Sequence, residues 1–156
     1  MKKKKVIFVA GVGGHLTELL QLDSIFKDYD YTLVTEKTEV TKDLKDKYNV
    51  RYFIYNNKKN FIKYLFVNGF NLLNSIYTYF KIRPDVVVTT GPNTGVYLCQ
   101  LAHMIKKKVI FIETYANVTN STKSGRIVYK FADHFVVQWE SLKKEYPNAL
   151  YFGGIN

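Results

Sequence analysis

The sequence predicts a single α/β domain with a Rossmann-like, mostly parallel sheet. Short apolar runs typical of buried strands alternate with helix-length segments along all 156 residues. This alternation is the pattern of parallel strands joined by right-handed crossovers. The first apolar run, residues 6–10, passes directly into Gly11, Gly13 and Gly14 and then into an amphipathic segment. That order is typical of the first ligand loop of a doubly wound sheet.

The expected strands are short apolar runs bounded by polar or glycine-containing turns. They lie at Lys5–Ala10, Tyr31–Thr35, Arg51–Tyr55, Asp85–Thr89, Lys108–Glu113, His134–Val137 and Leu150–Phe152. The expected helices fill the intervals between these strands. They lie at His15–Phe26, Val40–Lys47, Asn60–Lys81, Thr94–Ile105, Gly125–Ala132 and Trp139–Glu145. No internal repeat or low-complexity segment interrupts the alternation, so we predict one domain over residues 1–156.

The composition points to an anionic partner. The chain carries 23 Lys and Arg against 13 Asp and Glu, a formal net charge of +10. Such a surface suits nucleic acid, anionic lipid or a phosphorylated substrate, and solubility alone is a further explanation. No helix-turn-helix, zinc-finger or RNP-type aromatic motif is present, so nucleic acid is not predicted as a partner.

The cysteine count and the amino-terminal residues further limit the classes of protein to which this chain can belong. A single cysteine, Cys99, excludes an internal disulfide and suits a reducing compartment. No Cys/His cluster has metal-ligand spacing, so neither a metal nor a cofactor is predicted. The lysines at 2–5 and the apolar run after them resemble a signal peptide, but the run is too short and lacks a cleavage site. We interpret this segment as the first strand with a basic lead-in.

The first glycine loop predicts an anion site. Glycines let the backbone approach a bound group, and the free N–H groups of a first helical turn favour an anion such as a phosphate or diphosphate. The spacing is Gly-x-Gly-Gly-His, which differs from the Gly-x-Gly-x-x-Gly of dinucleotide sites. Glu36 lies in a Thr-Glu-Lys-Thr loop rather than closing the second strand in the dinucleotide manner. A nicotinamide dehydrogenase is therefore disfavoured.

Two further loops follow later strands, at Gly91-Pro92-Asn93-Thr94-Gly95 and at Glu113. Because the carboxyl ends of parallel strands meet at one edge of the sheet, all three loops should line one rim. Thr94 could cap the fourth helix, and a turn with a helix cap is the simpler alternative for its loop. We predict that the two glycine loops bind a phosphate or diphosphate. The residues are Gly11, Gly13, Gly14, His15, Gly91, Asn93, Thr94 and Gly95.

His15 and Glu113 are the candidate catalytic residues. A helix N-terminus opposes a positive imidazole, so His15 would be a neutral general base or a hydrogen-bond donor to a phosphoryl oxygen. Glu113 ends an apolar strand at the expected rim, where a carboxylate can bind an acceptor hydroxyl or remove its proton. The alternatives are a loop-packing histidine and a strand-end salt bridge.

The segment from Phe61 to Phe80 is too apolar for an ordinary surface helix. Its one charged residue is Lys63, and a narrow polar stripe recurs at helical spacing. The stripe consists of Asn68, Asn71, Ser75 and Thr78. The segment could be fully buried, could meet a protein partner, or could lie in a membrane interface. In the membrane interpretation the contacting residues are Phe61, Tyr64, Leu65, Phe66 and Phe70, flanked by Lys58, Lys59, Lys63 and Lys81. Three asparagines and a glycine argue against a membrane-spanning helix.

Several blocks of sequence resemble the amino-terminal half of a GT-B glycosyltransferase. They are Gly-Gly-His-Leu-Thr-Glu at 13–18, Pro-Asp-Val-Val-Val-Thr-Thr-Gly at 84–91, Ser-Gly-Arg at 124–126, Ala-Asp at 132–133, Val-Gln-Trp-Glu at 137–140, Tyr-Pro at 146–147 and Tyr-Phe-Gly-Gly at 151–154. The chain is most similar to PssD/CpsF-type polysaccharide biosynthesis proteins. Those resemble the Alg-family, membrane-anchoring subunit of the dolichol-linked GlcNAc transferase. MurG-type transferases share the Gly-Gly-His loop.

The resemblance implies a division of labour between two chains. This half resembles the acceptor-binding, membrane-associated subunit, and a separate small subunit resembling the carboxyl-terminal half would hold the nucleotide sugar. Residues 151–156 resemble the point where a one-chain enzyme crosses to its second domain. The eukaryotic subunit has an amino-terminal membrane helix that is not seen here. We therefore expect peripheral attachment at the cytoplasmic face of the membrane.

The expected function follows from that division. The chain would be the acceptor-side subunit of an inverting transferase that adds a sugar from a UDP-sugar to a polyprenyl-diphosphate-linked saccharide, in capsule or exopolysaccharide assembly. Bacterial members of the resembled type imply β-1,4-galactosyl transfer, and the Alg-type relatives imply N-acetylglucosaminyl transfer. The alternative is a non-catalytic scaffold that anchors and activates a separate catalytic chain.

Overall fold

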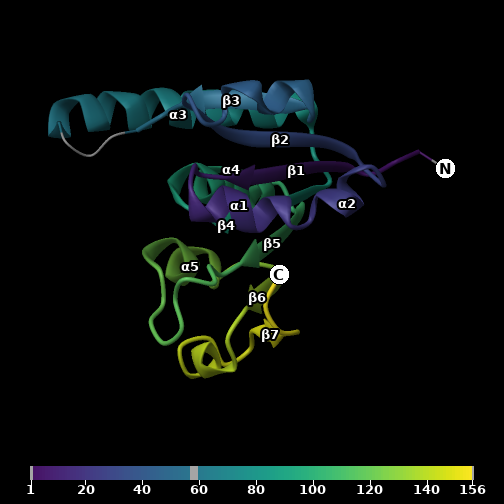
Figure 1. Ribbon diagram of the computed structural model, residues 1–156, viewed down its shortest axis with the longest axis vertical. Coiled ribbons are helices and arrows are strands. Elements are labelled where there is room, and N and C mark those ends of the chain that lie inside the picture. The colour runs from purple at the N-terminus through teal and green to yellow at the C-terminus, as the bar shows by residue number, and fades with distance from the viewer. Residues whose placement is uncertain (1, 57–59, 156) are drawn as a thin grey trace.

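The computed structural model describes residues 2–56 and 60–155, without the side chain of Asn93 (Figure 1). Its centre is one sheet of seven parallel strands in the order β3-β2-β1-β4-β5-β6-β7. The strands are β1 Lys5–Ala10, β2 Asp30–Lys37, β3 Val50–Ile54, β4 Val86–Gly91, β5 Lys108–Ile112, β6 His134–Val137 and β7 Leu150–Tyr151. The predicted Rossmann-like parallel sheet is therefore confirmed.

The helices connect these strands, with two segments tighter than expected. The α-helices are α1 Gly14–Leu20, α2 Asp23–Phe26, α3 Phe61–Ile82, α4 Asn93–Met104 and α5 Lys123–Val128. The connections at Lys42–Asp46 (η1) and Glu140–Lys144 (η2) are 3₁₀ turns, not the predicted α-helices. The predicted helix from His15 to Phe26 is interrupted because the N–H groups of Gln21 and Leu22 bond to carbonyls three residues back.

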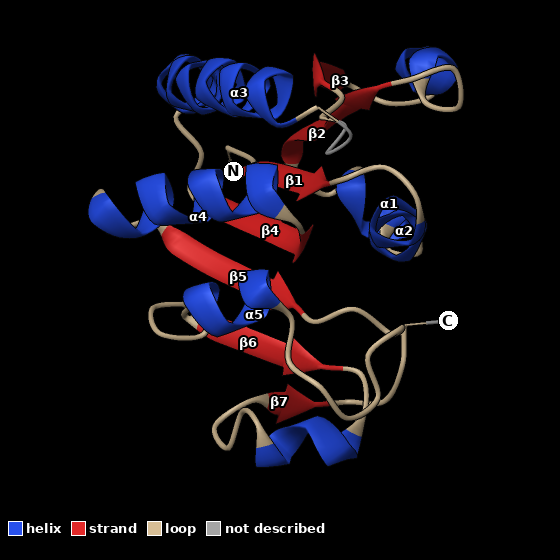
Figure 2. Cartoon of the chain, turned by 90° about the vertical axis from the view of Figure 1, so that its left-hand side faces the viewer, coloured by secondary structure: helices blue, strands red, loops and turns tan. Residues whose placement is uncertain are grey.

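Helices cover both faces of the sheet, as Figure 2 shows. Alternate residues of each strand point to opposite faces, so Ile7 and Val9 pack toward α4 whereas Val6 and Phe8 pack toward α1 and α2. On the second face the rings of Phe8 and Phe26 stack with centroids 4.1 Å apart. The near-continuous apolar character of the central strands thus reflects burial on both sides.

Helix α3 lies along the β3 side of the sheet (Figure 2), and its polar stripe faces the protein. Asn71, Ser75 and Thr78 are buried. Asn71 donates from Nδ2 to the Ile54 carbonyl (2.8 Å) and accepts from the Ile54 N–H (3.2 Å), so it pairs the end of edge strand β3. The Ser75 hydroxyl donates to the Asn71 carbonyl (2.8 Å). Asn71 and Ser75 therefore have hydrogen-bond partners inside the protein, whereas the buried Thr78 hydroxyl has none among the described residues.

The opposite face of α3 is apolar and exposed. Phe61 is 71% exposed, Phe66 76% and Leu73 66%. A fully buried helix, one of the three alternatives, is therefore wrong, because only one face of α3 is buried, that of Asn71, Ser75, Thr78 and Tyr79. None of the helices in the described ranges has the length and continuous apolarity needed to cross a bilayer.

We expect Asn71→Ala to destabilise the protein, because it removes the side chain that bonds both the N–H and the carbonyl of Ile54. The loss in free energy of unfolding should be about 2 kcal/mol, measured by urea denaturation. Leu73→Ser is the matched control on the same helix and should change stability by less than about 0.5 kcal/mol. The opposite ranking would contradict the inward orientation of the stripe.

Candidate functional site

Two glycine loops meet at the carboxyl edge of the sheet. The Gly11 N–H donates to the Gly91 carbonyl (3.0 Å), which joins the end of β1 to the end of β4. A Cβ on Gly11 would fall 2.5 Å from Pro92 Cδ, so no larger residue fits there. Gly91 has φ of 91°, a left-handed conformation that favours glycine. The predicted convergence of these loops is therefore present.

The first loop then opens its backbone to solvent. Gly13 has φ of 90°, and a Cβ on either Gly13 or Gly14 would meet no heavy atom within 4 Å. Helix α1 begins at Gly14, and the Gly13 carbonyl accepts from the Thr17 N–H (3.1 Å). The backbone ahead of α1 is thus accessible to a bound group.

His15 lies beside the second glycine loop. Its carbonyl accepts from the Thr90 hydroxyl (2.7 Å), and a Cβ on Gly91 would lie 3.7 Å from His15 Cε1. The buried Nδ1 has no hydrogen-bond partner among the described residues. His15 lines a hollow of about 210 Å³ with Lys123 and Ser124, which begin α5. We call this the His15 hollow.

The residues of the second glycine loop have different structural roles. Thr94 does not cap α4, because the helix already begins at Asn93 with Pro92 before it. Gly95 faces the sheet rather than the rim, since a Cβ there would lie 2.2 Å from Thr89 Oγ1. Its role is close packing of α4 on β4. The side chain of Asn93 lies outside the described structure.

Glu113 is fully buried just beyond β5. Its Oε1 accepts from the Thr114 N–H (3.0 Å), and its Oε2 accepts from the Tyr146 hydroxyl (2.8 Å). The Thr122 hydroxyl, which also caps α5, bonds to both carboxylate oxygens. This carboxylate therefore holds together the loop before α5, which is a positioning role. Burial, with Glu113 as the next cause, raises the pKa of Tyr146 above its usual range.

A second polar network ties α1 to the carboxyl-terminal part of the sheet, and our sequence reasoning assigned it no role. Glu18 accepts from the Thr114 hydroxyl (2.8 Å) and from Gln138 Nε2 (3.3 Å). Gln138 Nε2 also bonds the Glu113 carbonyl, and its Oε1 accepts from the Ile155 N–H (2.9 Å). Glu18 and Gln138 both belong to the sequence blocks that carry the family resemblance, and that was the available signal.

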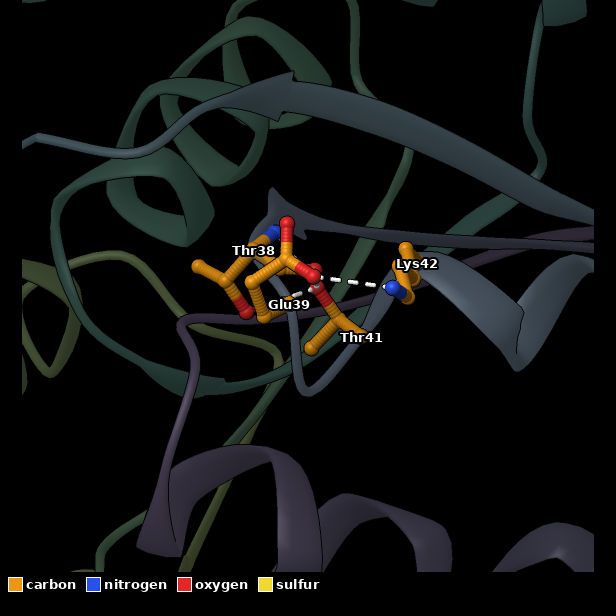
Figure 3. Close-up of polar contacts among 4 residues, drawn as sticks. All are labelled: Thr38, Glu39, Thr41 and Lys42. Carbon is orange, nitrogen blue, oxygen red and sulfur yellow. Dashed lines mark hydrogen bonds and ion pairs between the residues drawn. The ribbon is translucent and has the colours of Figure 1, made fainter.

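Glu36, which the sequence analysis placed in a loop and used only to disfavour a dinucleotide site, instead belongs to β2. It lies near the end of β2, and its Oε2 accepts from the Val12 N–H in the first glycine loop (3.1 Å). Burial raises its pKa, while the Val12 hydrogen bond and the charge of His15 oppose that rise. The Thr41 hydroxyl supports the following turn by donating to the Glu36 carbonyl (2.7 Å); Figure 3 shows this turn with its Lys42–Glu39 ion pair.

Glu36 lines a second hollow of about 230 Å³ between the first glycine loop and α3, which we call the Glu36 hollow. Tyr64, predicted to face a membrane, is only partly exposed and lines this hollow instead. The two hollows share Pro92 as a common wall. Within the described ranges, no three His, Cys, Asp or Glu side chains are placed to hold a metal ion.

Comparison with known protein families gives a match over almost the whole chain. The family described as "Oligosaccharide biosynthesis protein Alg14 like" matches residues 6–155. The chain belongs to this Alg14-like family. Similar proteins include "UDP-N-acetylglucosamine transferase subunit ALG14" of Homo sapiens, 28% identical over 96% of this chain and 82% of that protein. The Schizosaccharomyces pombe subunit of the same name is 29% identical over 97% of this chain and 83% of that protein.

Solved structures share the fold at low sequence identity. MurG of Acinetobacter baumannii aligns with a TM-score of 0.71 at 14% identity, over 88% of this chain and 42% of that one. UDP-N-acetylglucosamine 2-epimerase from Rickettsia bellii also gives 0.71 at 14% identity, over 98% of this chain and 45% of that one. This Alg14-like chain therefore spans less than half of each of these proteins, and the likeness concerns fold alone.

We expect Gly125→Ala to destabilise the protein, because its Cβ would lie 2.2 Å from Glu113 Oε2 and 2.5 Å from the Tyr146 hydroxyl. The free energy of unfolding should fall by about 1–3 kcal/mol. Gly69→Ala is the control, since its Cβ meets nothing within 4 Å on an exposed part of α3. That variant should be more stable than wild type by up to about 1 kcal/mol in thermal denaturation. An unaffected Gly125→Ala would contradict the tight packing around Glu113.

Proposed function

We propose that this Alg14-like chain is the acceptor-binding, membrane-associated subunit of a two-chain glycosyltransferase. It would present a polyprenyl-diphosphate-linked saccharide to a separate, donor-binding subunit that holds a UDP-sugar. The observation that carries the proposal is the rim where both glycine loops, His15 and the start of α5 meet. Family membership supports it, because the named relatives are subunits of UDP-N-acetylglucosamine transferases.

In this proposal some residues of the rim bind the diphosphate, and His15 transfers the proton. The open backbone at Gly13 and Gly14 offers N–H groups to a diphosphate. His15 lines the His15 hollow and takes the proton of the attacking acceptor hydroxyl. The acceptor oxygen then bonds to the anomeric carbon as UDP leaves, which inverts the configuration. Lys123 adds positive charge beside His15.

We further propose a bacterial polysaccharide context for this activity. The blocks at 13–18 and 137–140 support the likeness to PssD/CpsF-type proteins, which act in capsule or exopolysaccharide assembly. In that context the transferred sugar would be β-1,4-linked galactose. The names of the relatives favour N-acetylglucosamine instead, so both UDP-sugars belong in the assay.

We propose that α3 attaches the chain to the cytoplasmic face of the membrane. Phe61, Leu65, Phe66 and Phe70 are exposed on one side of the helix. Of these, Leu65, Phe66 and Phe70 border an apolar groove of about 750 Å³, which is also lined by Ile54, Ile62 and Leu73. Lys63 and Lys81 are exposed near opposite ends of the helix, an arrangement suited to anionic headgroups. The predicted flanking Lys58 and Lys59 lie outside the described residues.

We expect His15→Ala to abolish transfer by the complex co-purified from its native membranes in mild detergent. The assay supplies UDP-galactose or UDP-N-acetylglucosamine and undecaprenyl-diphosphate-linked sugars, and kcat should fall by at least about 100-fold. His134→Ala, at the opposite edge of the sheet, should leave both activity and assembly intact. The non-catalytic scaffold would be supported instead by two results together. His15→Ala would retain full activity, and other substitutions at the rim would lower activity only when they weaken assembly of the complex.

We expect α3 to determine membrane binding. Combined Phe61→Ser, Leu65→Ser and Phe66→Ser should weaken binding to phosphatidylglycerol-containing vesicles by about tenfold or more, because each removes apolar area from the contact. Vesicle sedimentation measures this affinity. The control replaces Met104 and Ile127, exposed apolar residues on other helices, by serine. Equal losses in the two variants would contradict attachment through α3.

A further inference from the structure

The Glu36 hollow is a polar space with no cationic side chain among its described lining. Its lining combines a carboxylate, phenol and amide groups, and backbone of the first glycine loop. The polar side chains are those of Glu36, Tyr55, Asn56, Tyr64, Asn68, Asn71 and Thr94. At about 30 Å³ per water, 230 Å³ corresponds to roughly seven or eight waters, which is the scale of one sugar ring.

Glu36 is positioned to bind a neutral hydroxyl group. Its Oε2 is held by the Val12 N–H, which fixes the carboxylate against the first glycine loop. A Cβ on Gly11 would lie 3.7 Å from the same Oε2, so the carboxylate lies close to the loop backbone. Burial disfavours its charged form, as the direction of its pKa shift indicates, and a hydroxyl donor would offset that penalty.

The amide groups come from two other segments. Asn56 follows β3, and its buried Oδ1 has no hydrogen-bond partner among the described residues, whereas its Nδ2 donates to the Tyr64 carbonyl (3.3 Å). Asn68 lies on α3 one turn before Asn71 and lines the hollow, whereas Asn71 is fully engaged with Ile54. Amides and a carboxylate together supply the donors and acceptors that a polyhydroxyl ligand needs.

The two hollows therefore differ in the ligand that they suit. The His15 hollow contains Lys123 and a histidine, so it accommodates negative charge. The Glu36 hollow has a carboxylate in its lining, and this carboxylate disfavours a phosphate beside it. Pro92 is shared by both hollows, so one ligand could pass over it from one to the other.

We propose that the Glu36 hollow binds a neutral sugar residue of the lipid-linked acceptor, with Glu36 accepting a hydrogen bond from one of its hydroxyls. This inference rests on the proposed function, because it assigns a subsite to the same acceptor. It places the sugar beneath α3, with the attacking hydroxyl directed over Pro92 toward His15 and the diphosphate at the open Gly13 backbone. Glu36 is then a specificity-determining residue of the acceptor site.

The test measures binding of two probes to the full chain in detergent micelles. One probe is undecaprenyl diphosphate, and the other is undecaprenyl diphosphate linked to glucose or N-acetylglucosamine. Wild type should bind a sugar-bearing probe more tightly than the bare diphosphate. Glu36→Gln keeps an oxygen for the Val12 N–H but removes the charge, and should cut the affinity for the sugar-bearing probe by about tenfold. Its affinity for the bare diphosphate should not fall, because the substitution removes only a negative charge near that group.

Two further variants complete the design. Glu39→Gln is the matched control, because Glu39 is exposed three residues away and pairs only with Lys42 among the described ion pairs. It should bind both probes like wild type. Asn68→Ala removes a different group of the hollow from a different element, and should also lose affinity for the sugar-bearing probe alone. Circular dichroism and thermal denaturation establish that each variant is folded.

The outcomes separate this inference from the proposed function. If wild type binds both probes equally, or if Glu36→Gln and Asn68→Ala bind the sugar-bearing probe as wild type does, the sugar subsite is refuted while the acceptor-binding function stands. Equal losses for both probes would assign Glu36 to loop support and also refute the subsite. Failure of wild type to bind either probe would refute the proposed function itself.

Discussion

The close contact between the ends of β1 and β4 is the constraint on which the rim depends. The hydrogen bond from Gly11 to Gly91 joins two loops that are 80 residues apart, and the adjacent Pro92 leaves no room for a Cβ on Gly11. This contact places the wall between the two hollows and sets the position of His15 beside Gly91. A side chain at this point would separate the loops, because the carboxyl ends of the strands could no longer approach.

Two carboxylates, those of buried Glu113 and half-buried Glu18, hold the remaining side of the rim. Glu113 binds the loop before α5 through Thr122 and Tyr146, and Glu18 connects α1 to Thr114 and Gln138. These hydrogen bonds join the ends of β5, β6, α1 and α5. These elements are separated in the sequence but lie close together in the fold. Because charged acceptors form strong hydrogen bonds away from water, they fix irregular backbone that has no strand or helix pairing of its own.

Helix α3 reverses the usual distribution of polar and apolar side chains. Asn71 of its polar stripe pairs the edge strand, and apart from buried Tyr79 its large aromatic side chains are at least partly exposed. Such an exposed patch on a helix of 22 residues costs solubility unless something covers it, and its exposed lysines suit a membrane surface. The Glu36 hollow lies against the same helix, so membrane attachment and acceptor binding would share one element.

The sequence by itself determined the parallel sheet, the order of its elements and the glycine loops, because these follow from local periodicity and from backbone conformations that only glycine adopts. It also carried the family, through blocks that include Glu18 and Gln138. Tertiary structure alone decided which carboxylate faces the site. Glu113 and Glu36 both lie near strand ends, but one is enclosed by Thr122 and Tyr146 whereas the other borders a hollow. It also decided which face of α3 is buried, since that depends on hydrogen-bond partners on a neighbouring strand and not on the pattern within the helix.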